Sequence, residues 1–183
     1  MAREALPPGR RLRLKALVAT AACLALLAGC GGGGDETAAH VGGEEVSTAQ
    51  LEALVDHFRT EAQREGKSFP KDGTLAFHAV RNQLLSLLVY RTELKQAAER
   101  LGVQVSESEI ARRLPTGEQE GDTRGDTFAH DSVVAQIRTE RLFAKVTRGE
   151  MSASERNTRW AAFLARLKAG TKVRYEPGYA PGS

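Results

Sequence analysis

This chain of 183 residues has few cysteines, few aromatic residues and little net charge. Its two cysteines, Cys23 and Cys30, both lie near the N-terminus, so residues 31–183 can form no disulfide, cysteine nucleophile or cysteine metal site. Aromatic residues make up 5% of the chain, too few for the stacking platforms of single-strand nucleic-acid binders. The fold therefore has to be stabilised by its apolar core alone.

The charge balance gives no reason to expect a nucleic-acid partner. The chain has 26 basic and 23 acidic residues. The first 29 residues hold five of the basic and one of the acidic residues, which leaves 21 and 22 in the remainder. A nearly neutral domain lacks the clustered positive charge that nucleic-acid binding requires.

The first 29 residues have the layout of a secretory signal peptide. A basic head precedes an apolar stretch, residues 16–26, which only Thr20 interrupts. A membrane-spanning helix needs about 20 apolar residues, so the alternative of an anchor helix is disfavoured. The twin-arginine export route is a minority interpretation, because Arg13 stands where such signals usually have an aromatic residue. The basic head consists of Arg3, Arg10, Arg11, Arg13 and Lys15.

Small residues and one cysteine end this segment. Leu27-Ala28-Gly29-Cys30 resembles a bacterial lipobox, in which the cysteine is lipidated and cleavage leaves it as the new N-terminus. The resemblance implies cleavage between Gly29 and Cys30 and a fatty acyl anchor, such as palmitate, on Cys30. Two or three acyl chains give the stable anchoring that one does not. The protein would then be a lipoprotein on the extracytoplasmic face of the cell membrane. The alternative is an ordinary secreted protein with a free thiol.

The remainder of the chain is expected to divide into three parts. Residues 30–38 form a flexible, glycine-rich tether with almost no apolar content. Residues 39–176 are long enough for one modest domain. Residues 177–183 contain prolines and glycines and are expected to be an irregular tail.

Short strand patterns lie at both ends of the predicted domain. Residues 39–46 predict a hairpin in which Gly42 and Gly43 supply the positive φ angles of the turn. Residues 171–175 alternate as a strand does. An isolated two-stranded hairpin is marginal in water, so we expect Val173–Tyr175 to pair beside Ala39–Val41 or Glu45–Val46.

Helical periodicity fills the chain between these strands, so the fold class is mainly α. Residues 84–89 are apolar nearly all round, which places the second helix at the centre of the core. Three capping boxes are predicted, at Ser47–Gln50, Ser106–Glu109 and Ser152–Glu155. Pro115–Thr127 is polar and glycine-rich and is expected to be a mobile surface loop. Helices are predicted from Ser47 to Gly66, from Thr74 to Gly102, from Ser106 to Pro115, over 128–148 and from Ser152 to Gly170.

No catalytic or metal site can be recognised among the polar residues. His130-Asp131-Ser132 contains the residue types of a catalytic triad, but a triad is assembled in space and not by adjacency. The histidines His40, His57, His78 and His130 have no partners at a metal-ligand spacing. Glu140 interrupts the basic residues of the fourth helix, so they are interpreted as a solvated face. We predict no enzyme, no cofactor and no metal. The basic residues of that helix are Arg138, Arg141, Lys145 and Arg148.

Four segments carry a resemblance to a known family. HVGGEEVSTAQLEALV (residues 40–55), LLVYRTELKQAAERLGVQVSESEIARRL (87–114) and VVAQIRTERLFAKV (133–146) resemble successive elements of the SurA-type periplasmic chaperone domain. WAAFLARLKAGTKVRYEPGYAP (160–181) is similar to the closing helix and strand of these proteins and of lipid-anchored PrsA-like foldases. The resemblance implies a helical domain of the trigger-factor/SurA peptide-binding type with short terminal strands paired together.

The same resemblance implies a partner, namely unfolded or newly exported polypeptides bound through their apolar segments. In the family a parvulin-type prolyl isomerase domain usually precedes the closing helix, whereas here residues 148–151 join the helices directly and leave no room for one. We therefore expect a chaperone-like lipoprotein without catalysis. The alternatives are a structural lipoprotein that holds one fixed partner, and an isomerase in name only. Phe69, Phe77 and Tyr90 are candidate client contacts, with ordinary packing as the alternative for each.

Overall fold

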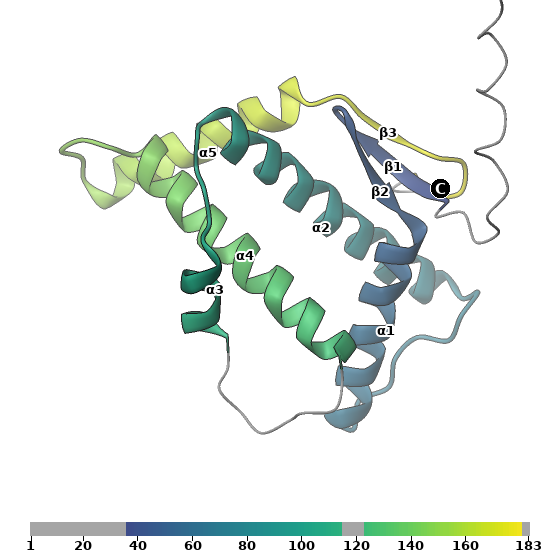
Figure 1. Cartoon of the computed structure of the whole chain (residues 1–183). Helices are drawn as coiled ribbons and strands as arrows, with labels where there is room; N and C mark the ends of the chain where they lie inside the picture. Colours follow the sequence, from purple (N-terminus) through teal and green to yellow (C-terminus); the bar gives the residue numbers. More distant parts are fainter. Residues whose placement is uncertain (1–35, 115–122, 181–183) are drawn as a thin grey trace, which may run out of the picture. The chain divides into compact units, whose positions relative to one another are not determined.

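The computed structural model describes residues 36–114 and 123–180 of the chain. Figure 1 shows a small sheet beside a set of packed helices, so the predicted fold class, mainly α with short terminal strands, is confirmed. The elements are β1 (Thr37–Val41), β2 (Glu44–Ser47), α1 (Thr48–Arg64), α2 (Leu75–Arg100), α3 (Glu107–Arg113), α4 (Thr123–Val146), α5 (Ala153–Gly170) and β3 (Val173–Tyr175).

β1 is the central strand of the sheet, with β2 and β3 antiparallel on its two sides. Ala39 faces Tyr175 and Val41 faces Val173, which confirms the first of the two pairings predicted for the closing strand. The sheet thereby joins the two ends of the domain. β1 begins at Thr37, two residues before the predicted hairpin and inside the predicted tether. The reason is that Ala38 is fully buried in the core, where polar tether character would not be tolerated.

The turn between β1 and β2 is fixed against α2. Gly42 has φ +60°, and a β carbon there would lie 2.8 Å from Gln96 Oε1. Gln96 Nε2 donates a hydrogen bond of 2.7 Å to the Val41 carbonyl, which holds that side chain over the turn. The prediction of positive φ at Gly43 is wrong. A two-residue hairpin with positive φ at its first central residue alone has a twist that suits the strands equally well.

The first two long helices start and end where the sequence indicates. Ser47 and Gln50 form the predicted capping box, because each side chain accepts a hydrogen bond from the other's backbone N–H, at 3.1 and 3.0 Å. Thr74 caps α2 by accepting from the Phe77 N–H. Gly66 and Gly102 follow α1 and α2 with φ angles of +66° and +62°, in the left-handed conformation that closes a helix.

α2 is the central element, as predicted. It packs against α1, α4, α5, β1 and β2. Its N-terminal part, with Leu84, Leu85 and Val89, belongs to a core cluster shared with α1 and the sheet. Its second half belongs to another cluster that includes Leu142 of α4 and Leu167 of α5. Figure 1 shows α2 and α4 running side by side in the same direction.

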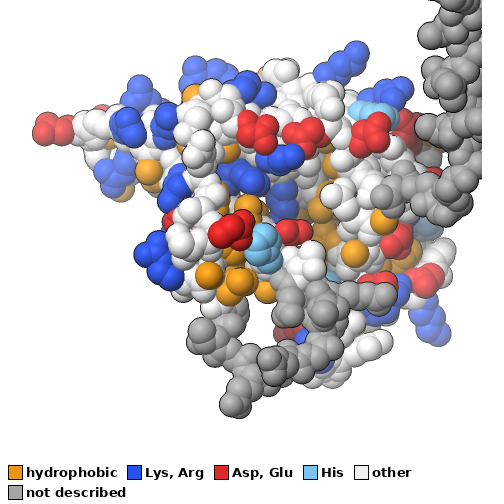
Figure 2. Space-filling model, in the orientation of Figure 1, with side chains coloured by type: hydrophobic (Ala, Val, Ile, Leu, Met, Phe, Trp, Pro, Cys, Tyr) orange, Lys and Arg blue, Asp and Glu red, His pale blue; other side chains and the backbone are white. Residues whose placement is uncertain are grey.

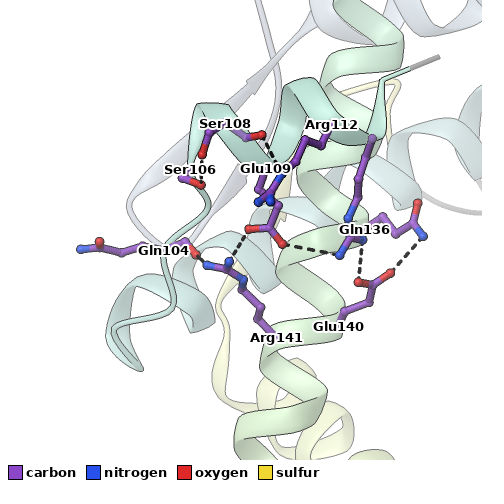
Figure 3. A network of polar contacts seen from close by, with 9 residues as sticks. Gln104, Ser106, Ser108, Glu109, Arg112, Gln136, Glu140 and Arg141 are labelled. Carbon is purple, nitrogen blue, oxygen red and sulfur yellow. Dashed lines mark hydrogen bonds and ion pairs between the residues drawn. The ribbon is translucent and has the colours of Figure 1, made fainter. Parts of the chain in front are cut away.

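The predicted capping box at the start of α3 is wrong. The Ser106 side chain makes no capping hydrogen bond and instead lies 3.2 Å from the Ser108 hydroxyl. Glu109 forms ion pairs with Arg141 and Arg113, and Figure 3 shows its carboxylate pointing toward Arg141. Two guanidinium groups offer a carboxylate stronger charge-assisted bonds than one backbone N–H does.

α4 begins at Thr123, five residues before its predicted start at Phe128, so residues 123–127 are helical and not loop. Residues 115–122 of the predicted loop lie outside the described residues. The Phe128 ring stacks on His57 of α1, with 3.6 Å between the ring centroids. Packing of this kind outweighs the poor helix propensity of Gly125, since a glycine inside a helix costs only about 1 kcal/mol relative to alanine.

α5 follows α4 after residues 147–152. Ser152 and Glu155 form the predicted capping box, whose hydrogen bonds hold the pKa of the Glu155 carboxyl below its usual value. Leu167 is buried, and Trp160, Phe163 and Leu164 pack beside it, so the predicted apolar stripe is confirmed.

The predicted tail, residues 177–183, is irregular in its described part but is attached to the domain. The Tyr179 ring lies under the Arg81 guanidinium, 4.6 Å from its centroid. Its hydroxyl accepts a hydrogen bond from Arg81 and shares another with Thr48. Arg81 also donates two hydrogen bonds to Glu52. The tail is therefore packed against both α1 and α2, which its proline and glycine content did not indicate.

Candidate functional site

A groove of about 520 Å³ lies between α2, α4 and α5. Leu87, Tyr90 and Leu94 line it from α2, because residues three and four apart lie on one face of a helix. α4 contributes Phe143 and α5 contributes Trp160. Figure 2 shows hydrophobic side chains broken up by charged and polar ones over the face that it draws.

The end of the groove near α5 is held by stacked aromatic rings. Trp160 meets Phe143 edge-on with 5.7 Å between centroids, and it stacks on Phe163 at 5.2 Å. Such arrangements are among the favoured geometries for aromatic pairs. The rings therefore form a firm apolar wall that an incoming side chain can pack against.

Arg91 forms part of the opposite wall. The side chain is half-buried, and its Nη2 donates to Ser132 Oγ over 3.4 Å, a long hydrogen bond. The guanidinium also lies 5.8 Å from the centre of the Phe128 ring. Burial lowers the pKa of Arg91, and the charge of Asp131 opposes that shift. Within the described residues Arg91 has no carboxylate at ion-pair distance.

Glu140 supplies the only acidic side chain among the residues that line this groove in the described part of the chain. Arg113 donates to it at 2.6 Å and Gln136 at 3.0 Å, and Figure 3 shows Gln136 and Glu140 side by side on α4. These hydrogen bonds lower the pKa of the Glu140 carboxyl. The charge of Glu140 is therefore already matched by its neighbours.

Of the three candidate contacts chosen from the sequence, one lies in the groove. Tyr90 lines it and is 37% exposed. Burial, followed by the nearby charge of Glu93, raises the pKa of the Tyr90 hydroxyl. Phe77 is only 8% exposed, which makes it a core residue. Phe69 packs edge-on against Phe77 and under Arg59, in a second hollow of about 440 Å³.

Arg91, Phe143 and Trp160 are groove residues that the sequence did not single out for binding. No pattern in the sequence separated them from buried positions, because a helix that is apolar nearly all round is expected to be covered by its neighbours. The sequence could not show which part stays uncovered, since that depends on the angles at which α4 and α5 pack.

The histidines and the triad-like segment have ordinary contacts. His40 lies between Glu45 and Glu176, at 3.7 and 3.0 Å. Ser132 is hydrogen-bonded to Arg91, while His130 lies beside Asp131 at 3.4 Å. Over residues 36–114 and 123–180 no three histidine, cysteine or acidic side chains are grouped so that they could hold a metal ion.

The basic residues of α4 do not act as one stripe. Arg141 is engaged by Glu109 and by the Gln104 carbonyl, to which Figure 3 shows it pointing. Arg138 is half-buried, which lowers its pKa, while the charge of Glu99 opposes that shift. Lys145 and Arg148 are exposed, in agreement with a solvated face, whereas Arg138 and Arg141 have the individual surroundings described above.

Gly29 and Cys30, the predicted cleavage and lipidation residues, lie outside the described residues. None of the described helices combines the length and the apolarity needed to cross a lipid bilayer.

A family model described as a SurA-like N-terminal domain matches residues 12–157. The matched range covers β1 to α4 and ends inside α5. No curated protein matches the chain.

Proposed function

The chain belongs to the family of SurA-like N-terminal domains, and from this premise we propose that it binds unfolded or newly exported polypeptides without catalysing a reaction on them. The family is of the chaperone type, and no catalytic domain is seen in the described part of the chain. We further propose that the protein acts outside the cytoplasm and is held on the membrane surface by a lipid at Cys30.

The groove between α2, α4 and α5 is the observation that carries the proposal. Most of its exposed lining is apolar, and the polar part comes from Arg91, Ser132, Gln136, Thr139 and Glu140. It therefore fits an apolar side chain that emerges from a polar backbone. Burial of apolar surface contributes about 25 cal/mol per Å². A groove of this volume takes only a few side chains, which supports weak, reversible binding to many sequences.

The test is suppression of client aggregation by the full-length chain with a matched pair of variants. Tyr90→Ser removes an exposed apolar group inside the groove. Leu75→Ser removes one that is 89% exposed on the same helix but does not line the groove. Light scattering of several unrelated unfolding clients should be suppressed by the wild type and by Leu75→Ser, and clearly less by Tyr90→Ser.

Two outcomes would contradict this account. If the wild type protects no client but captures one folded partner with fixed stoichiometry, the protein is a structural lipoprotein and not a chaperone. If it accelerates prolyl isomerisation of a model peptide, the non-catalytic part of the proposal fails.

The lipid anchor is tested separately by Cys30→Ala. If Cys30 is the acylation site, this variant should stay an unprocessed precursor without incorporated fatty acid. A variant that still fractionated as mature, membrane-bound protein would show that another feature anchors the chain.

A further inference from the structure

We propose that the groove selects polypeptide segments in which an aspartate or glutamate lies next in sequence to a bulky apolar residue. The apolar residue packs against Leu87, Phe143 and Trp160, and the carboxylate pairs with Arg91. This inference rests on the proposed function and names the class of segment that the same groove prefers.

Arg91 differs from the better-paired arginines of the domain. Arg81 donates two hydrogen bonds to Glu52, and Arg59 pairs with both Asp56 and Asp72. Arg91 is half-buried as well, but among the described residues its side chain donates only to the neutral Ser132 hydroxyl. Removing a charge from water is unfavourable unless a partner compensates it. A carboxylate from a bound segment supplies the compensation that the domain itself does not.

The geometry leaves Arg91 able to accept such a partner. A guanidinium has five N–H donors in a planar fork, and a single long bond to Ser132 engages one of them. Arg91 lies on the groove wall directly after Tyr90 and one turn after Leu87. An apolar side chain in the groove therefore brings its sequence neighbours within reach of the fork.

The other charge on the groove does not cancel this preference. Glu140 is engaged by Arg113 at 2.6 Å and by Gln136 at 3.0 Å. Asp131 influences Arg91 only as a more distant charge, beyond ion-pair distance. The uncompensated charge at the groove is therefore positive, and charge complementarity favours an acidic residue over a basic one.

The test uses two short leucine-containing peptides that differ only in a central glutamate or glutamine. Both are acetylated and amidated, so that no terminal carboxylate competes, and both carry the same fluorophore. Fluorescence anisotropy with the full-length chain at low salt should show the glutamate peptide binding about tenfold more tightly. The difference should shrink as salt is added, because screening weakens an open ion pair.

Arg91→Gln should bring the glutamate peptide to the affinity of the glutamine peptide while leaving the latter nearly unchanged. Arg91→Lys keeps the charge but loses the fork and should retain part of the preference. Arg138→Gln is the matched control, because Arg138 is also half-buried but does not line the groove. It should leave the preference intact.

The outcomes separate this inference from the proposed function. Equal binding of both peptides by the wild type overturns the inference and leaves polypeptide binding standing. Binding of neither peptide overturns both. If circular dichroism shows that the Arg91 variants are unfolded, the wild type still tests the inference, through the difference in affinity between the two peptides and the salt dependence of that difference.

Discussion

At the scale of single residues, the clearest energetic anomaly is Glu93 of α2. It is 6% exposed, and within the described residues it forms no hydrogen bond or ion pair. Burial raises the pKa of its carboxyl group, and the charge of Lys168 only partly opposes that shift. The folded state therefore favours protonated Glu93. The resulting stability is fully present below the unfolded pKa of about 4.3 and is lost as pH rises through the folded pKa.

Glu93→Gln removes this pH-dependent loss. We expect the variant to exceed the wild type in free energy of unfolding at pH 7 and to match it below about pH 4. Urea denaturation over a series of pH values measures the difference. Glu99→Gln, at an exposed position of the same helix, should change stability by less than about 0.5 kcal/mol. A pH-independent effect of Glu93→Gln would mean that the carboxyl is not destabilised by its charge.

At the scale of elements, the serines before α3 and α5 form a matched pair. Ser152 accepts a hydrogen bond from the Glu155 N–H, whereas Ser106 makes no capping bond. Ser152→Ala should therefore lower the free energy of unfolding by about 1 kcal/mol, the usual effect of losing an N-cap. Ser106→Ala should have a much smaller effect. Thermal denaturation measures both, and equal losses would contradict the different caps seen at the two helices.

The same pair shows which features a sequence can predict. Helix ends at Ser47, Gly66 and Gly102 depend on residues a few positions away, so they could be read directly from the order of amino acids. The capping box at Ser106 does not form, because Glu109 pairs with Arg141 instead. Arg141 lies 35 positions beyond Ser106 and comes near only in the folded chain. Its loss is therefore a tertiary effect that no local pattern records.

The groove, too, could be predicted only in part from the sequence. The sequence predicted that α2 would be the central helix and named Tyr90 as a possible contact. It could not distinguish Leu87 or Trp160 in the groove from buried leucines, because both kinds of position have the same helical spacing. Arg91 looked like any surface arginine until packing placed it beside Ser132 and away from every carboxylate at ion-pair distance in the described part of the chain.

At the scale of the whole molecule, residues 173–180, here called the closing segment, hold the two ends of the domain together. β3 pairs with β1, and five positions beyond Arg174 the Tyr179 side chain contacts Arg81 of α2 and Thr48 of α1. The residues after β3 therefore contribute to stability, although their composition is that of a loose tail. A cation–π contact and its accompanying hydrogen bonds together contribute about 1–2 kcal/mol when partly buried.

Tyr179→Ala should accordingly lower the free energy of unfolding by about 1–2 kcal/mol, because it removes both the ring under Arg81 and the hydroxyl. Tyr179→Phe keeps the ring and should lose roughly half as much. Chemical denaturation of the two variants measures these terms. Arg81→Lys is the complementary change, because it keeps a charge near Glu52 but removes the planar fork that donates two hydrogen bonds to it. If Tyr179→Ala unfolds at the wild-type denaturant concentration while Arg81→Lys does not, the stabilising contact of Arg81 is Glu52 alone, and the closing segment ends at β3.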